Sequence, residues 1–150
     1  GSQRTPIDKS DLPRVLKKFK NFSASRFDDD IAKRRKIASI YNSEIKSGED
    51  VQLPPGPSEN DNNFDTYQNY ELRAERRDEL KRHLHQNGIG TIIQWGGKAV
   101  HQEKNLGLTN FKLPFTDDFF EKCLMLPMNT SIKYSEANYI SKKVNEFYGK

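Results

Sequence analysis

A proline-rich stretch divides the sequence and limits what it can fold into. Residues 52–63, "QLPPGPSENDNN", combine three prolines with a glycine and several amide side chains. Proline has no backbone N–H to donate, and glycine adds conformational freedom, so this composition excludes a helix and a central strand. We expect residues 52–63 to be an exposed connection between a helical part and a part in which helix and strand patterns alternate.

Two helices are expected before this connection. Ser10 or Asp11 can cap a short helix, and Ser23 or Ser25 can start a longer helix, which we assign to residues 27–46. Apolar residues in the longer helix recur at the spacing of one helical face, which predicts that this face packs against a core. The members of this predicted stripe are Phe27, Ile31, Ala38, Tyr41 and Ile45.

Helix and strand patterns alternate after the connection. Strand formers dominate residues 64–74 and 89–95, and "LMLPM" at 124–128 indicates a third short strand. Helical patterns follow each strand, with caps expected at Thr116 and Ser135. The apolar side chains expected on these helices are Leu80 and Leu84, then Phe119, Phe120, Cys123 and Leu124, and finally Ile140, Val144, Phe147 and Tyr148. This order predicts an α/β (α+β) fold with a small sheet of about three strands flanked by helices.

The length favours one hydrophobic core, since 150 residues correspond to a single domain. Gly1 and Ser2 are typical of the remnant of a cleaved tag, so residues 1–26 are assigned to this remnant and a helical N-terminal extension. We assign residues 27–150 to one small domain, whose α/β core spans residues 64–148.

The composition predicts a lean core and a heavily solvated surface. Apolar residues make up 33% of the chain and charged residues 31%, and the mean hydropathy is −0.93. The sequence holds no apolar run of the roughly 20 residues that a membrane helix needs, and no basic-then-apolar leader. Cys123 is the only cysteine, which excludes an internal disulfide. We therefore expect a cytoplasmic protein without membrane contact.

A cluster of basic residues on the two N-terminal helices raises an alternative function. The net charge is +4, and a stand-alone module that binds protein or nucleic acid through these helices has to be weighed. Three aspartates interrupt the cluster, and it lacks the aromatic ladder of an RNA-binding sheet, so a solvated helix face explains it better. The basic residues are Lys17, Lys18, Lys20, Arg26, Lys33, Arg34, Arg35 and Lys36.

The usual signatures of catalysis and metal binding are absent from the sequence. His83 and His85 stand two apart on a predicted helix and point to different faces, which excludes a shared metal ion. Cys123 beside two phenylalanines is typical of a small buried thiol rather than of a nucleophile. No hydrolase triad order, phosphate-binding loop or dinucleotide glycine pattern occurs. We expect no catalytic residue and no metal site in this chain.

The stretch "GIGTIIQWGGKAVHQ", residues 88–102, is the best candidate for a binding loop. Two adjacent glycines let the backbone approach a ligand closely, and an amide, an indole, a cation and an imidazole surround them. The candidate residues are Gln94, Trp95, Gly96, Gly97, Lys98 and His101. In the alternative, Trp95 fills the core, the glycines form an ordinary turn and His101 lies on the surface. The residue types alone leave both interpretations open.

Several separated motifs resemble the C-terminal part of the DegT/DnrJ/EryC1/StrS family of pyridoxal-phosphate-dependent sugar aminotransferases. The resemblance covers about residues 27–148 and does not extend to residues 3–26. The motifs are "FDDDIAKRRKIASIYNSEI", "FDTYQNYELRAERRDELKRHLHQNGIGTIIQW", "HQEKNLGL", "LPFTDDFFEKCLMLPMNTSI" and "YSEANYISKKVNEFY". The resemblance implies that this chain is the small C-terminal domain of an aspartate-aminotransferase-type (fold type I) enzyme.

The resemblance also implies the parent reaction and its partners. Family members transfer an amino group, here expected from glutamate, to a keto-sugar linked to a nucleotide diphosphate. An N-terminal domain carries the lysine that holds pyridoxal phosphate, and the small domain completes the sugar-nucleotide pocket and contributes to a homodimer. We accordingly expect this chain alone to bind no cofactor and to be inactive, and we do not expect nucleic acid as a partner.

By the same resemblance, the loop at residues 94–101 lines the sugar side of the site. His101 matches the histidine of the family pattern, whereas Gln94, Trp95 and Gly96 replace the common His-Tyr-Pro. Lys98 is the one lysine of the loop but lacks a phosphate cradle and a ring partner, so it is not expected to hold the cofactor. An amide, an indole, a cation and an imidazole suit the hydroxyls, flat faces and phosphates of such a substrate.

Overall fold

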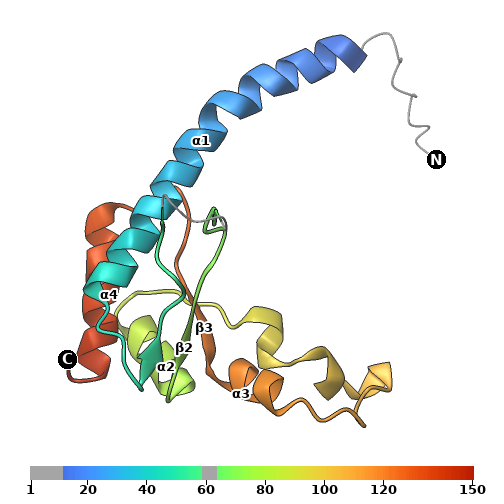
Figure 1. Cartoon of the computed structure of the whole chain (residues 1–150). Coiled ribbons are helices and arrows are strands. Elements are labelled where there is room, and N and C mark those ends of the chain that lie inside the picture. The colour runs from blue at the N-terminus through green and yellow to red at the C-terminus, as the bar shows by residue number, and fades with distance from the viewer. Residues whose placement is uncertain (1–11, 59–63) are drawn as a thin grey trace.

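The computed structural model describes residues 12–58 and 64–150, and within these ranges it describes side chains from residue 26 onward. The helices and strands in chain order are α1 (Leu12–Glu44), β1 (Val51–Gln52), β2 (Tyr70–Ala74), α2 (Arg77–Gln86), α3 (Pro114–Lys122), β3 (Cys123–Leu126) and α4 (Tyr134–Phe147) (Figure 1). Short 3-10 turns, η2 (Gln94–Gly97), η3 (Val100–Gln102) and η4 (Lys104–Leu106), lie between α2 and α3.

The strands form one antiparallel sheet in the order β1, β2, β3. Val51 of β1 pairs with Ala74 of β2, and Tyr70 of β2 pairs with Leu126 of β3. Tyr70, Leu72 and Ala74 are buried, as the alternation of side chains along a strand requires when one face meets a core. A small three-stranded sheet flanked by helices confirms the predicted α/β (α+β) fold class.

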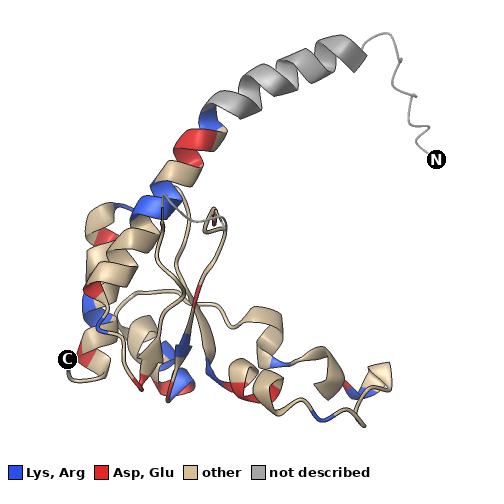
Figure 2. Ribbon diagram, viewed as in Figure 1, with Lys and Arg blue, Asp and Glu red and all other residues tan. Residues whose placement is uncertain are grey.

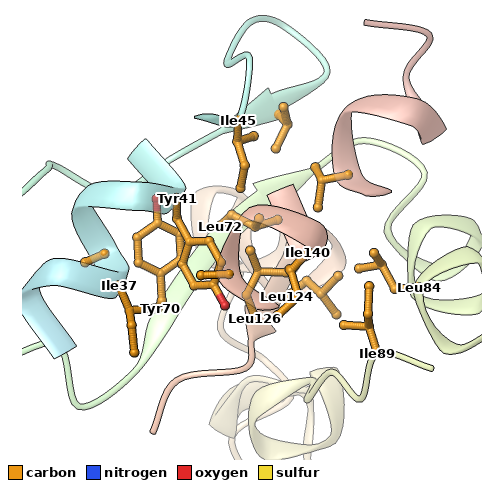
Figure 3. Packing of buried hydrophobic residues seen from close by; sticks show 14 of the residues in the cluster. Ile37, Tyr41, Ile45, Tyr70, Leu72, Leu84, Ile89, Leu124, Leu126 and Ile140 are labelled. Atoms are coloured by element: carbon orange, nitrogen blue, oxygen red, sulfur yellow. The ribbon is translucent and has the colours of Figure 1, made fainter. Parts of the chain in front are cut away.

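The core lies between the sheet and three helices. Side chains from α1, α2 and α4 meet the buried face of β2 and β3 (Figure 3). The labelled members are Ile37, Tyr41, Ile45, Tyr70, Leu72, Leu84, Ile89, Leu124, Leu126 and Ile140. The Tyr41 and Tyr70 rings pack with centroids 4.8 Å apart, and the Tyr41 hydroxyl donates to the Pro127 carbonyl oxygen at 2.7 Å. This bond satisfies a polar group that burial would otherwise penalise.

The predicted break between two N-terminal helices is wrong, because α1 runs unbroken through Ser23 and Ser25. No proline or glycine occurs in residues 14–47, so no residue forces the helix to stop. The predicted caps Ser10 and Asp11 lie outside the described residues. The predicted stripe is confirmed except at its first member: Ile31, Ala38, Tyr41 and Ile45 are buried, and Phe27 is exposed.

The predicted strands are correct in number but not in position. β2 occupies only the end of the predicted strand at 64–74, and β3 starts one residue before the predicted 124–128, so Cys123 belongs to β3 rather than to α3. β1 was not predicted, because two residues are too short to show an alternating pattern. The pairing of β1 with β2 is a long-range contact that local sequence does not encode.

A left-handed turn replaces the end of the strand predicted at residues 89–95. Trp95, Gly96 and Gly97 have φ angles of 53°, 65° and 75°, and the Lys98 N–H donates to the Trp95 carbonyl oxygen at 3.3 Å. Glycine adopts this conformation freely, whereas an L-residue such as tryptophan pays roughly 1–2 kcal/mol. Successive left-handed residues cannot continue a strand, and of the predicted strand only Ile92 pairs with the sheet, through a bridge to Met125.

The predicted helix caps at Thr116 and Ser135 are also displaced. α3 begins at Pro114, because proline is pre-organised for the first turn of a helix. α4 begins one residue before Ser135, where the Lys133 N–H donates to the Glu136 carboxylate at 2.7 Å. This hydrogen bond caps the start of α4, the role that was predicted for Ser135.

The proline-rich connection has no regular structure over residues 53–58, as predicted, but it packs along α1. Asn42 of α1 donates from Nδ2 to the Pro54 carbonyl oxygen at 2.9 Å. The Arg35 guanidinium donates to the carbonyl oxygens of Ser58 and Asp65 at 2.9 and 2.7 Å. Hydrogen bonds from side chains of α1 therefore fix the connection, which has no backbone pairing with a strand.

Removing the Tyr41 hydroxyl should destabilise the fold. We expect Tyr41→Phe to lower the free energy of unfolding by about 1.5 kcal/mol, because the Pro127 carbonyl loses its partner. Tyr139→Phe is the matched control: its hydroxyl also meets a carbonyl, at 3.3 Å from Asn87, but the residue is 44% exposed. Urea unfolding monitored by circular dichroism measures both. Equal losses in the two variants would contradict a buried role for Tyr41.

A second prediction concerns the left-handed turn. Gly97→Ala should lower the free energy of unfolding by roughly 1–2 kcal/mol, because a Cβ there would adopt φ +75° and approach Ile93 Cγ2 at 3.1 Å. Gly90→Ala is the control, since its φ is not left-handed and a Cβ there meets no described atom within 4 Å. We expect this control to stay within about 0.5 kcal/mol of the parent. The same unfolding assay would refute the turn if Gly97→Ala were as stable as Gly90→Ala.

Candidate functional site

The candidate site lies on residues 93–122, which we call the arm. Two reciprocal backbone hydrogen bonds close its base: the Ile92 N–H donates to the Met125 carbonyl oxygen at 3.2 Å, and the Met125 N–H donates to the Ile92 carbonyl oxygen at 2.8 Å. Between these bonds the chain forms the 3-10 turns and α3, on the side of the sheet away from α1 and α4 (Figure 1). The arm therefore leaves and re-enters the domain at one point on β3.

An ion pair fastens α3 to β2, and a hydrogen bond fastens it to the start of α2. Asp118 of α3 pairs with Arg73 of β2 and with Lys122 one turn further along α3. The hydrogen bond from Lys122, together with the nearby positive charges, holds the pKa of the Asp118 carboxyl below its usual value. Arg77 of α2 donates from Nη1 to the Phe120 carbonyl oxygen at 2.9 Å. These contacts fix α3 as one wall of the site.

His101 is buried inside the arm and is held by α3. Only 8% of the residue is exposed, and its Nε2 lies 2.8 Å from Oδ1 of Asp117. Gln102 donates from Nε2 to the same carboxylate oxygen. The interpretation of His101 as a surface side chain is therefore wrong. Asp117 was not among the predicted site residues.

Trp95 of the same arm, in contrast to His101, lies largely in solvent. The left-handed turn directs the side chain outward, and the residue is 76% exposed. The alternative in which Trp95 fills the core is therefore wrong. An exposed tryptophan on a strained backbone is unusual, and such features concentrate at functional sites.

An apolar groove of about 890 Å³ lies along the arm. Most of its lining is aliphatic or aromatic, and the polar groups are one cation, one carboxylate, one imidazole and one hydroxyl. The lining residues are Trp95, Lys98, Ala99, Val100, His101, Glu103, Leu106, Leu108, Phe111, Leu113, Thr116 and Phe120. A concave, largely apolar surface with a few polar groups is the usual form of a small-molecule site.

Half of the predicted site residues line this groove. Trp95, Lys98 and His101 are brought together there. Gln94, Gly96 and Gly97 do not belong to its lining; the two glycines instead shape the left-handed turn that presents Trp95.

The apolar wall of the groove was missed by sequence reasoning. Leu106, Phe111 and Leu113 lie in segments with neither helical nor strand periodicity, so no pattern assigned them to a buried face. These residues are apolar although they lie in an irregular segment, where residues are normally polar and solvated, and this contrast was the one indication of a binding surface. The exposed apolar side chains of the arm include Trp95, Val100, Leu106, Phe111, Leu113 and Phe115.

The other candidate groups have structural partners. His83 Nε2 lies 3.1 Å from the Lys143 carbonyl oxygen, and no group of three metal-ligating side chains occurs among the described residues. Cys123 is fully buried, and burial, followed by the Glu71 charge, raises the pKa of its thiol. A thiol in this environment is a poor nucleophile.

The predicted basic cluster is only partly described. Side chains of Lys17, Lys18 and Lys20 lie outside the described residues, and basic and acidic segments alternate along the part of α1 that is described (Figure 2). Lys33 and Arg35 donate to backbone carbonyl oxygens of the same chain. Among the described helices, none combines the length and apolar character required to cross a membrane.

Two curated relatives resemble about three quarters or more of the chain. A pleiotropic regulatory protein from Geobacillus stearothermophilus is 30% identical over 118 residues, which cover 77% of this chain and 31% of that protein. GDP-perosamine synthase from Escherichia coli O157:H7 is 31% identical over 124 residues, covering 81% of this chain and 32% of the synthase. The chain thus spans about a third of the length of the relatives it matches.

Solved structures match this chain in fold over a similar share of their length. A DegT DnrJ EryC1 StrS aminotransferase from Brucella abortus matches with a TM-score of 0.69 at 26% identity, covering 81% of this chain and 32% of that one. DesI, solved in the presence of its TDP-sugar product, matches in fold with a TM-score of 0.69 at 16% identity, over 82% of this chain and 32% of DesI. The PLP-form of Spr1654 from Streptococcus pneumoniae matches in fold with a TM-score of 0.66 at 22% identity, with the same coverage.

The family assignment follows from the extent of the sequence match. Residues 22–145 match the DegT/DnrJ/EryC1/StrS aminotransferase family, which is well over half of the chain. The match begins within α1 and ends within α4, so it includes the sheet, the arm and the groove. The chain belongs to the DegT/DnrJ/EryC1/StrS aminotransferase family.

Proposed function

We propose that this chain is the part of a nucleotide-sugar aminotransferase that recognises the substrate and contributes to dimerisation. The parent enzyme would transfer an amino group, from glutamate, to a keto-sugar linked to a nucleotide diphosphate. The observation that carries the proposal is the groove on the arm, where Trp95, Lys98 and His101 converge on an apolar wall. The family assignment supports the reaction class.

The chemistry of the groove suits the parts of such a substrate. The Trp95 indole offers a flat face to a base or a sugar ring, and the Lys98 ammonium is a point charge for a phosphate. The aliphatic and aromatic wall suits the apolar faces of a deoxysugar. Among the structural neighbours, DesI is solved with a TDP-sugar product, which supports this ligand class for the proposal.

The described groove residues do not fit pyridoxal phosphate. A bound phosphate needs several converging donors, and Lys98 is the only lysine or arginine in the groove lining, beside the Thr116 hydroxyl, the Trp95 indole N–H and the His101 ring in an otherwise largely apolar surface. The Asp117 carboxylate, which could otherwise pair with a ring nitrogen, is engaged by His101 and Gln102. We therefore assign the cofactor of the parent enzyme to a separate N-terminal domain, and no step of the reaction to this groove.

The exposed apolar side chains of the arm support the dimerisation role. Phe115 is 91% exposed, and Trp95 and Val100 are also largely in solvent. A cluster of this kind on one segment is typical of a surface that is covered in an assembly. In the proposal, the rest of the parent enzyme and its second subunit close the groove and cover these side chains.

The proposal is testable with the 150-residue chain and a thymidine-diphosphate hexose. Trp95 is the only tryptophan, so its fluorescence reports binding at the groove directly. We expect a saturable change with weak, roughly millimolar affinity, because part of the pocket is supplied by other domains. Lys98→Ala should weaken binding roughly tenfold, because a charge-assisted contact is lost.

Lys112→Ala is the matched control for this titration. It removes a second exposed lysine from the arm, but one that does not line the groove. The control should bind as the parent chain does. A fluorescence that never saturates, or equal weakening by the two variants, would overturn the recognition role.

A further inference from the structure

The backbone N–H of Ala99 fixes the orientation of the Gln102 side-chain amide. The Ala99 N–H lies 3.0 Å from Oε1 of Gln102. A backbone N–H can only donate, so this end of the Gln102 amide must be its oxygen. The other end, the NH2 group, therefore faces Asp117 and donates to its Oδ1.

Oδ1 of Asp117 then determines which ring nitrogen of His101 carries the proton. Oδ1 of Asp117 accepts from Gln102, and His101 Nε2 lies 2.8 Å from it. An ionised carboxylate has no proton to give, so the ring nitrogen that faces it must carry the hydrogen. In the neutral imidazole the other nitrogen, Nδ1, is then a bare acceptor.

Nδ1 has no hydrogen-bond partner among the described residues, and it is not one of the buried side-chain atoms that lack a partner, so it is open to the groove although the residue as a whole is only 8% exposed. The ring lines the groove, whose charged members are Lys98 and Glu103. An acceptor that opens onto a largely apolar groove has few competing partners there, so a ligand that supplies a donor can bind to it. Phosphate oxygens carry no proton at neutral pH, whereas sugar hydroxyls can donate.

We propose that Asp117 is a positioning residue that fixes His101 with its proton on Nε2, so that Nδ1 accepts a hydrogen bond from a hydroxyl of the hexose. This inference rests on the proposed function and refines it: His101 contacts the sugar, and Lys98 is left for the diphosphate. Asp117 itself does not line the groove and acts through His101.

The first experiment measures the tautomer of the His101 ring directly. Nitrogen-15 spectra of His101 on the high-pH plateau, where the ring is neutral, should show the proton on Nε2 in the parent chain, slowed in its exchange with water. Asp117→Ala removes the acceptor, so the ring should populate both tautomers and exchange faster. Glu121→Ala is the control, because this exposed carboxylate lies on the same helix and takes part in no described hydrogen bond or ion pair.

A parent ring protonated on Nδ1 would overturn the inference. So would a Glu121→Ala variant that changes the ring as much as Asp117→Ala does. Amide spectra of the α4 residues verify that both variants remain folded.

The second experiment compares thymidine diphosphate glucose with thymidine diphosphate by Trp95 fluorescence. Asp117→Ala should weaken binding of the sugar nucleotide about tenfold and leave the affinity for thymidine diphosphate unchanged. Equal weakening of both ligands, or of neither, would overturn the assignment of His101 to the hexose. If neither ligand binds the parent chain, the proposed function and the hydroxyl assignment fail together, and the ring spectra still decide whether Asp117 sets the tautomer.

Discussion

The reciprocal hydrogen bonds between Ile92 and Met125 are the constraint on which the groove depends. They tie the two ends of the arm to one point on β3, so residues far apart in sequence face each other across it. Without this closure the arm would be a long irregular excursion with little to oppose its conformational entropy. Within it, α3 enters β3 directly, and the position of the strand therefore dictates the position of Asp117 and of the His101 ring.

The sheet separates this site from the core that stabilises it. One face of β2 packs Tyr70 and Leu72 against α1, α2 and α4 (Figure 3). On the strand positions between them, Glu71 and Arg73 are only partly buried, and one oxygen of Glu71 lacks a hydrogen-bond partner among the described residues. Burial raises the pKa of this carboxyl. The groove lining on the arm, in contrast, includes no member of the buried core cluster.

Much of the fold could be predicted because its signals are local. Leu80 and Leu84, one turn apart, and the stripe at Ile140 and Val144 are buried as the helical spacing indicates. The site was predicted only in part, because its geometry depends on pairing between distant segments. β1 exists only through its contact with β2, and the partnership of His101 with Asp117 joins residues of two different elements. The exposure of Trp95 follows from backbone angles that no periodicity reveals.

The position of a bound sugar nucleotide relative to Trp95 is the most direct test of the recognition role of the groove. Intermolecular nuclear Overhauser effects would be recorded between the indole protons of Trp95 and a thymidine-diphosphate hexose bound to the 150-residue chain. We expect effects between the indole and the base or sugar protons, together with effects between the ligand and the methyl groups of Leu106 and Leu113 in the groove wall. Ligand contacts confined to another surface, such as the proline-rich connection at residues 53–58, would contradict this role.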